Sequence, residues 1–150
     1  MEAESYSDES VADFIHQNFV PLEAHIKEHP AYFKRFEALW TPTVLVMDSE
    51  GVERYRIEGY LPKDWFRARL QMARARVLFM HKRFADAQQL YADVANLYGT
   101  LAVAAEAIYY RDVCKYKATN DHTSLGTAAT ELAEKFPNDE WRLKSLPWAH

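Results

Sequence analysis

Few side chains in this sequence are arranged for chemistry. Its single cysteine, Cys114, cannot form an internal disulfide or a CxxC pair. The helical stretch around it favours a core thiol over a reactive one, because free cysteine is among the most buried residue types. No Ser-His-Asp order, phosphate-binding glycine loop, paired-carboxylate motif or dinucleotide fingerprint is present. We therefore expect no catalytic residues and no cofactor.

Two histidines, His25 and His29, have a four-residue spacing that suits a shared metal ion when both lie on one helix. The first is expected at a strand end and the second just before a helix that Pro30 begins, so they do not share a helical face. No third ligand is evident, whereas zinc sites use at least three protein ligands. The sequence predicts no metal site.

Arginine is concentrated in one part of the chain. Arg69, Arg76 and Arg83 recur at seven-residue intervals within a basic run, which places them near one stripe of a helix. Two interpretations stay open. The stripe is either a solvated face whose long stems cover apolar neighbours, or a surface that docks an acidic segment of a partner. Docking of this kind predicts salt-sensitive binding.

The step Thr41-Pro42 joins an expected helix end to an apolar run at residues 44–47. An unbroken apolar run of this length is typical of a buried strand. A proline just ahead of such a strand must take its first position or a special turn, because it supplies no N–H to the ladder. Thr41–Pro42 is also a candidate cis bond, since only X-Pro bonds make the cis form inexpensive.

The elements that position these residues divide the chain into a first half of strands and helices and a second half of helices alone. The first half is predicted as a three-stranded sheet with helices, its strands at residues 19–26, 44–47 and 52–57. A long helix then starts at Pro62. After residue 79 only helical patterns follow, expected at residues 84–98, 101–118, 124–136 and 139–146.

Two segments of the helical half are alike. Residues 90–99 and 128–137 match at an offset of 38 residues, with an acid, an aliphatic residue, an alanine, an aromatic residue and a terminal breaker in common. Helix pairs that repeat at this period indicate a small α-solenoid. We expect two regions, 1–80 and 81–150, packed together because no flexible linker separates them.

Composition narrows the class of protein and the kinds of partner further. The chain of 150 residues is 49% hydrophobic, enough for a domain with a real core. Its net charge of −4 argues against nucleic acid as a partner. No run of 18 apolar residues is present, and the N-terminus is acidic where a signal peptide would be basic. We expect no membrane partner and a cytoplasmic location.

The order of elements in residues 1–78 resembles the later three-quarters of the thioredoxin fold. In that family a cis proline precedes the third core strand, and Thr41-Pro42-Thr43 matches this step. The turn at 48–51 and the step at 58–60 before the last helix match as well. The resemblance implies a substrate or partner groove along Trp40, Thr41, Pro42 and Thr43, while burial statistics leave Trp40 equally open to a core position.

The resemblance also implies a missing part. In thioredoxins the CxxC pair lies at a helix N-terminus, where the dipole lowers the pKa of the nucleophilic cysteine. It lies only a few residues before the segment that corresponds to residues 1–4. The chain as given is therefore expected to lack the first core strand and the CxxC. That strand is central in the fold, so its absence predicts a rearranged sheet or an open edge, with strand addition or a homodimer through that edge.

The helical half loosely resembles tetratricopeptide repeats. Ala75, Leu78, Ala87, Tyr91 and Val94 match small and aromatic positions of that repeat, and the second repeat departs from them in part. Two repeats fall below the three or so that independent stability requires. The thioredoxin-like half is therefore expected to act as a cap, and the family implies peptide or protein binding on a concave face.

The predicted fold class is α/β plus α: a truncated thioredoxin-like three-stranded sheet with helices, followed by a small tetratricopeptide-like helical array. The expected function is a redox-inactive module that binds a protein or peptide. Two alternatives stay open. One is a thiol-disulfide oxidoreductase of the thioredoxin family whose CxxC lies upstream of the given start. The other is a subunit completed by strand exchange in an oligomer.

Overall fold

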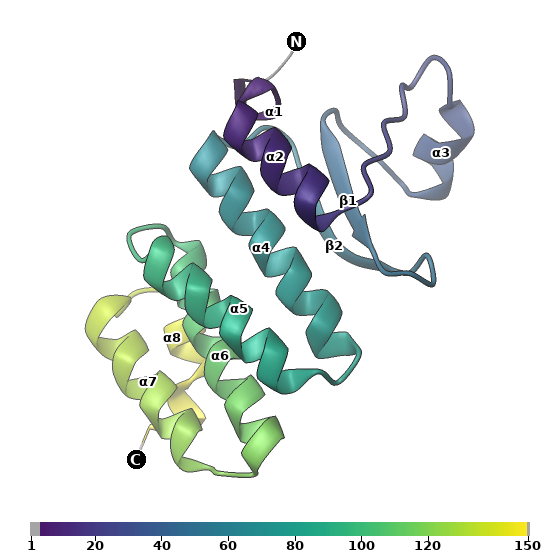
Figure 1. Ribbon diagram of the computed structural model, residues 1–150. Coiled ribbons are helices and arrows are strands. Elements are labelled where there is room, and N and C mark those ends of the chain that lie inside the picture. Colours follow the sequence, from purple (N-terminus) through teal and green to yellow (C-terminus); the bar gives the residue numbers. More distant parts are fainter. Residues whose placement is uncertain (1–3, 150) are drawn as a thin grey trace.

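The computed structural model describes residues 4–149 (Figure 1). Residues 1–3 and residue 150 lie outside the described residues. The predicted match of residues 1–4 to the segment after the thioredoxin CxxC therefore falls largely outside them. The elements are α1 (Glu4–Ser7), α2 (Glu9–Asn18), α3 (Pro30–Arg35), β1 (Thr43–Met47), β2 (Glu53–Glu58), α4 (Lys63–Met80), α5 (Phe84–Leu97), α6 (Val103–Thr119), α7 (Thr123–Lys135), α8 (Glu140–Lys144) and the 3-10 helix η1 (Leu146–Trp148). The sheet and α1–α3 lie on one side of α4, and the later helices lie on the other (Figure 1).

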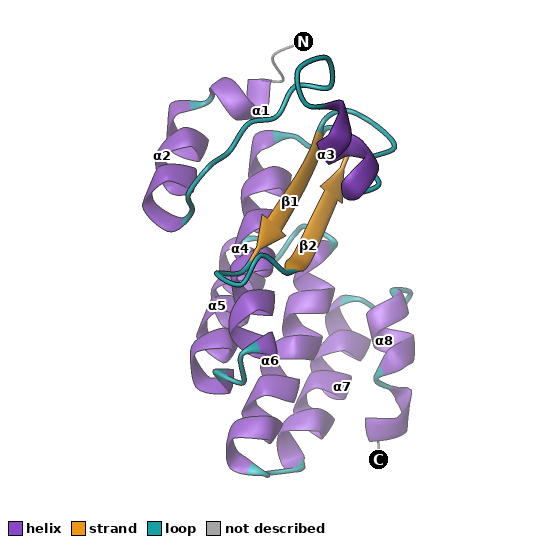
Figure 2. Cartoon of the chain, turned by 90° about the vertical axis from the view of Figure 1, so that its right-hand side faces the viewer, coloured by secondary structure: helices purple, strands orange, loops and turns teal. Residues whose placement is uncertain are grey.

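The two strands form an antiparallel hairpin. Thr43 is opposite Glu58 and Val46 is opposite Tyr55, and a bulge follows Val46. Gly51 closes the turn with φ +76°, a conformation that residues with a Cβ rarely adopt. One face of the sheet packs against α4, which lies behind it in Figure 2. The hairpin predicted from the turn composition at residues 48–51 is therefore present.

The strand predicted over residues 19–26 is not formed. Within the described residues the sheet has two strands, and residues 19–25 have no regular structure. Val20 and Leu22 project into solvent, with exposed fractions of 97% and 86%. Pro21 supplies no N–H for a ladder, and no described strand lies beside this segment to pair with it. Apolar and β-branched residues form a strand only where a neighbouring strand is present.

The helix that Pro30 begins is shorter than expected. It ends at Arg35, and Glu37 follows in the left-handed region at φ 50°. The chain then reaches β1 as an irregular loop rather than as a helix end. Among the described elements α3 packs against no other helix or strand. The guanidinium of Arg56 on β2 holds the loop by donating to the carbonyl oxygens of Phe36 and Glu37.

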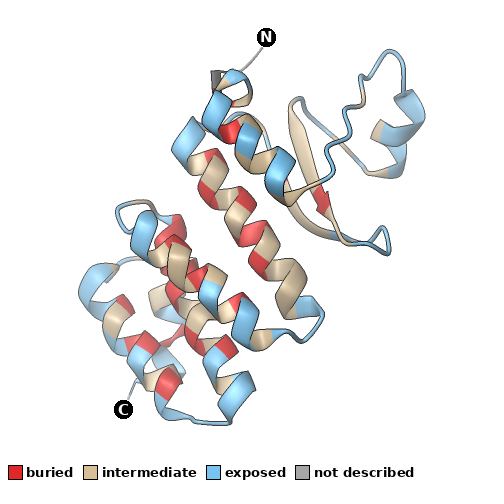
Figure 3. Ribbon diagram, in the orientation of Figure 1, coloured by how far each residue is buried: buried red, intermediate tan, exposed pale blue. Residues whose placement is uncertain are grey.

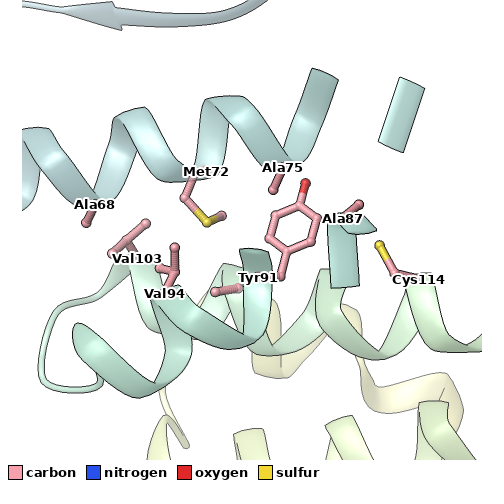
Figure 4. Close-up of a cluster of buried hydrophobic side chains, with 9 residues drawn as sticks. Ala68, Met72, Ala75, Ala87, Tyr91, Val94, Val103 and Cys114 are labelled. Carbon is pink, nitrogen blue, oxygen red and sulfur yellow. The ribbon is translucent and has the colours of Figure 1, made fainter. Parts of the chain in front are cut away.

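The long helix α4 contributes to the hydrophobic cores of both halves. Its buried side chains fall on two faces, because residues three or four apart align along a helix (Figure 3). The cluster on the sheet side has as buried members Val11, Val46, Ile57, Phe66, Leu70 and Ala73. The cluster on the helical side has Ala68, Met72, Ala75, Ala87, Tyr91, Val94, Val103, Ala107 and Cys114 (Figure 4). The predicted packing of the two halves therefore runs through one helix.

The helical half stacks its helices in chain order, from α4 through α7. A third cluster joins α6 to α7 through Ala105, Ile108, Ala128 and Leu132, with Trp141 and Trp148 packed against it. The second and fourth helices of this array begin at Phe84 and Thr123, close to the offset of the matching segments. The helical array predicted after residue 79 is confirmed.

No helix in the described part of the chain has both the length and the apolar character needed to cross a bilayer.

Candidate functional site

The step from Trp40 to Thr43 lies on the surface at the start of β1. The Thr43 hydroxyl donates to the carbonyl oxygen of Trp40 at 2.6 Å, and the Gly59 N–H donates to the carbonyl oxygen of Pro42 at 2.8 Å. The Thr41–Pro42 bond is cis. Trp40 is 72% exposed and its neighbour Leu39 is 84% exposed, so Trp40 does not belong to the core. The backbone of the step is held by hydrogen bonds, while the side chains of Trp40 and the preceding Leu39 face solvent.

The outer edge of β1 continues from this step. Opposed residues in an antiparallel pair alternate between hydrogen-bonded and non-hydrogen-bonded positions. Because Pro42 accepts from Gly59, the backbone groups of Val44 and Val46 face β2. Those of Thr43, Leu45 and Met47 therefore face the opposite edge, which no described strand covers. A sheet edge of this kind is a template for an added strand.

A shallow cleft of about 580 Å³ lies beside the Trp40–Thr43 step, between α3 and β2. It is lined by Phe33, Lys34, Glu37, Ala38, Leu39, Arg56 and Glu58. The Arg56 guanidinium is already engaged, since it pairs with Glu53 at 2.7 Å and donates to the overlying loop. The cleft therefore offers the apolar side chains of Phe33, Ala38 and Leu39 together with the charged side chains of Lys34 and Glu37.

The structure brings two of the predicted stripe arginines together and separates the third. Arg69 and Arg76 on α4 both face Glu106 on α6, with N···O distances of 3.8 and 3.7 Å. Arg83 lies beyond the end of α4 and pairs with Asp86 at 2.7 Å. The helix ends before it, and the left-handed turn at Lys82 breaks the seven-residue spacing.

Two partners of these arginines were not anticipated from the sequence, Tyr55 and Glu106. The Arg69 Nη1 donates to the Tyr55 hydroxyl at 3.0 Å. Burial raises the pKa of the Glu106 carboxyl, while the charges of Arg69 and Arg76 act to lower it. No local spacing could have identified this group, because it joins β2, α4 and α6, which are far apart in sequence.

The remaining candidates from the sequence are Cys114, His25 and His29. Cys114 is fully buried in the cluster on the helical side of α4, and burial raises the pKa of its thiol to about 12. The His25 Nδ1 accepts from the Lys27 N–H at 3.3 Å, and His29 stacks on Tyr32. Nowhere in residues 4–149 do three histidine, cysteine or acidic side chains gather as a metal ion requires.

A comparison with models of protein families gives a match, and it covers the half that contains the hairpin and the Thr-Pro-Thr step. Residues 1–74 match the model of the thioredoxin-like domain. The N-terminal half of the chain therefore belongs to the thioredoxin-like family, as the resemblance of its hairpin and Thr-Pro-Thr step predicted. The match ends inside α4, the helix that both halves share. The corresponding comparisons with curated proteins and with solved structures find no match.

Proposed function

We propose that this chain is a protein-interaction module whose thioredoxin-like half binds an extended segment of a protein partner. The observation that carries the proposal is the outer edge of β1, with which no described strand pairs, beside the exposed Leu39 and Trp40. The backbone groups of Thr43, Leu45 and Met47 offer hydrogen bonds to an added strand, which is a common mode of peptide recognition. Trp40 offers a large apolar surface at one end of that strand, and tryptophan is enriched at binding hot spots.

The proposed binding uses no thiol chemistry. The 150 residues contain one cysteine, and it is buried with a raised pKa. A buried protonated thiol is neither a nucleophile nor half of a redox pair. On this proposal the thioredoxin-like scaffold positions an edge and an aromatic side chain, and the partner segment takes the place of a further strand.

The test is a selection of short peptides from a random display library on the intact chain. We expect the enriched peptides to bind the wild-type protein, and to bind the Trp40→Ser variant about tenfold more weakly or worse. The amide protons of Leu45 and Met47 should become protected from exchange in the complex. Trp148→Ser is unsuitable as a control because Trp148 packs on the α6–α7 cluster, whereas Tyr60→Ser removes an exposed aromatic residue of the same half.

Two results would overturn the proposal. One is that no peptide is enriched over background. The other is that enriched peptides bind the Trp40→Ser variant as well as the wild type and leave the β1 amides unprotected. If the wild-type chain instead forms a dimer that protects the same amides, the occupant of the edge is a second copy, and the strand-exchange alternative replaces the proposed partner segment.

A second candidate function is a thiol-disulfide oxidoreductase, which the thioredoxin-like match of residues 1–74 favours. It requires a CxxC that the 150 residues do not carry. The intact mass of the protein purified without a tag from its source cells separates the two. A mass near 17.5 kDa supports the interaction module, and a mass several kilodaltons larger, with a CxxC in the added segment, supports the reductase.

A further inference from the structure

The surface where α4 meets α6, which in turn contacts α8, carries a group of charged side chains that is separate from the edge of β1. Arg69 and Arg76 lie one above the other on α4 and share the single carboxylate of Glu106. The two arginine side chains are about one-third exposed, at 35% and 32%, and that of Glu106 is 13% exposed. Two partly exposed arginine side chains therefore lie beside one largely buried acid.

The Glu106 carboxylate does not form close hydrogen bonds with Arg69 and Arg76. Charge-assisted hydrogen bonds between a guanidinium and a carboxylate are about 2.7–2.9 Å long. The observed distances of 3.8 and 3.7 Å are well beyond that range. Arginine carries five N–H donors in a planar fork that fits a carboxylate. Arg69 also donates to the Tyr55 hydroxyl and Arg76 is also hydrogen-bonded to the Tyr91 side chain, and the other N–H groups of each fork can meet a second acceptor.

The neighbouring charges leave an excess of positive charge. Lys144 on α8 lies 3.7 Å from Glu140, and both act electrostatically on Glu106. Together the surface has three cations, Arg69, Arg76 and Lys144, and two carboxylates. One positive charge is uncompensated, on a chain whose net charge is −4. This local excess of positive charge suits a carboxylate of an acidic segment, although the rest of the chain is acidic.

Aromatic side chains flank the two arginines. The Arg76 guanidinium lies 5.6 Å from the centroid of the Tyr110 ring, and that ring meets Trp141 edge-on at 5.4 Å. The Lys144 ammonium lies 3.8 Å above the Trp141 ring. On the other side, Tyr55 accepts from Arg69. Arginine, tyrosine and tryptophan are the residues most enriched at the hot spots of protein interfaces.

We infer that Arg69 and Arg76 bind a carboxylate side chain of an acidic protein segment at this surface, with Tyr110 and Trp141 contacting the residues beside it. Arg83 takes no part, because it lies beyond α4 and is paired with Asp86. The site lies on residues other than those of the β1 edge, so it can fail or succeed independently of the proposed function.

The experiment measures the binding of fluorescein-labelled pentaglutamate to the full chain, with pentaglutamine as the uncharged control. We expect pentaglutamate to bind and to weaken as salt rises, and pentaglutamine not to bind. Arg69→Gln and Arg76→Gln should each weaken binding about tenfold, since each removes a charge-assisted hydrogen-bonding partner. Arg83→Gln removes the same charge from the same region and should leave binding unchanged.

The Glu106→Gln variant gives a result that a purely structural role could not. Removing the acid that competes for the two arginines should strengthen pentaglutamate binding about threefold to tenfold. Circular dichroism and thermal unfolding of every variant show that each one is folded. The inference is overturned if pentaglutamine binds equally, if Arg83→Gln weakens binding as much as Arg69→Gln, or if a folded Glu106→Gln protein binds no more tightly than the wild type.

Discussion

Asp48 and His81 are 33 residues apart in sequence, and the His81 Nε2 lies 3.1 Å from the Asp48 Oδ2. The same oxygen accepts from the Arg54 Nε at 2.8 Å, and the Asp48 Oδ1 accepts from the backbone N–H groups of Glu50 and Val52. The Asp48 side chain is almost fully buried beneath these partners. One carboxylate therefore closes the hairpin turn and ties it to the end of α4.

Replacing Asp48 by asparagine should destabilise the protein. The variant keeps the shape of the side chain but loses the negative charge that Arg54 and His81 face, and it places an amide where acceptors are needed. We expect a lower urea midpoint of unfolding. Asp86→Asn, which alters an exposed ion pair with Arg83, should leave the midpoint within error. Equal midpoints for the two variants would mean that the Asp48 contacts contribute little.

The contribution of Asp48 should also depend on pH. Hydrogen bonds, that from the Val52 N–H above all, together with Arg54 and His81, hold the pKa of the Asp48 carboxyl well below its usual value near 4. A lowered folded pKa means that the stabilisation is complete above the unfolded pKa and is lost as pH falls below it towards the folded value. Urea midpoints measured from about pH 6 to pH 2 should therefore converge for wild type and Asp48→Asn below about pH 4. A constant difference across this range would contradict the prediction.

Amide exchange along β1 should alternate. The N–H groups of Val44 and Val46 face β2, and those of Thr43, Leu45 and Met47 face the uncovered edge. We expect the second set to exchange about a hundredfold faster or more than the first, because hydrogen-bonded strand amides exchange only through opening. Exchange followed by NMR on the free protein measures this directly. Uniform protection along the strand would show that the outer edge is paired in solution.

Trp40 and Phe66 should differ sharply in their effect on stability. Phe66 is 2% exposed within the cluster on the sheet side of α4, so Phe66→Ala should cost about 3–5 kcal/mol of the free energy of unfolding. Trp40 is largely exposed, and Trp40→Ala should change that free energy by no more than about 0.5 kcal/mol. Urea denaturation of both variants provides the measurement. A large cost for Trp40→Ala would place this side chain in a packed interior.

Cys114 should resist modification in the folded protein. Its thiol is fully buried and its pKa is raised to about 12 by burial, so little thiolate forms near neutral pH. We expect alkylation by iodoacetamide at about pH 8 to be at least about a hundredfold slower in the native protein than in guanidinium-unfolded protein. Mass spectrometry of timed samples follows the reaction. Rapid labelling of the native chain would show that the thiol is accessible.

Local sequence signals were sufficient for much of the fold. The turn residues from Asp48 to Gly51, between an apolar run and an alternating segment, predicted the hairpin, and Pro62 predicted the start of α4 within a residue. The helical half followed from period and terminal breakers such as Gly99. These signals work because capping, turn geometry and helical periodicity depend on residues within a few positions of one another.

The predicted strand at residues 19–26 shows where such signals end. Val20, Leu22 and Ile26 have the composition of a strand, but a strand needs a partner ladder, and none of the described strands provides one. Pairing is decided between distant parts of the chain. A segment can therefore have strand character and still lie as an exposed loop.

By itself the sequence determined the hairpin, the order of the later helices and the absence of a second thiol among the 150 residues. Only the tertiary structure decided that Trp40 is exposed, that Arg83 leaves the stripe, and that Arg69 and Arg76 share Glu106 across two helices. The physical reason is that exposure and ion pairing depend on which surfaces pack together. That packing follows from α4 being buried on two faces at once, a relation that no local spacing encodes.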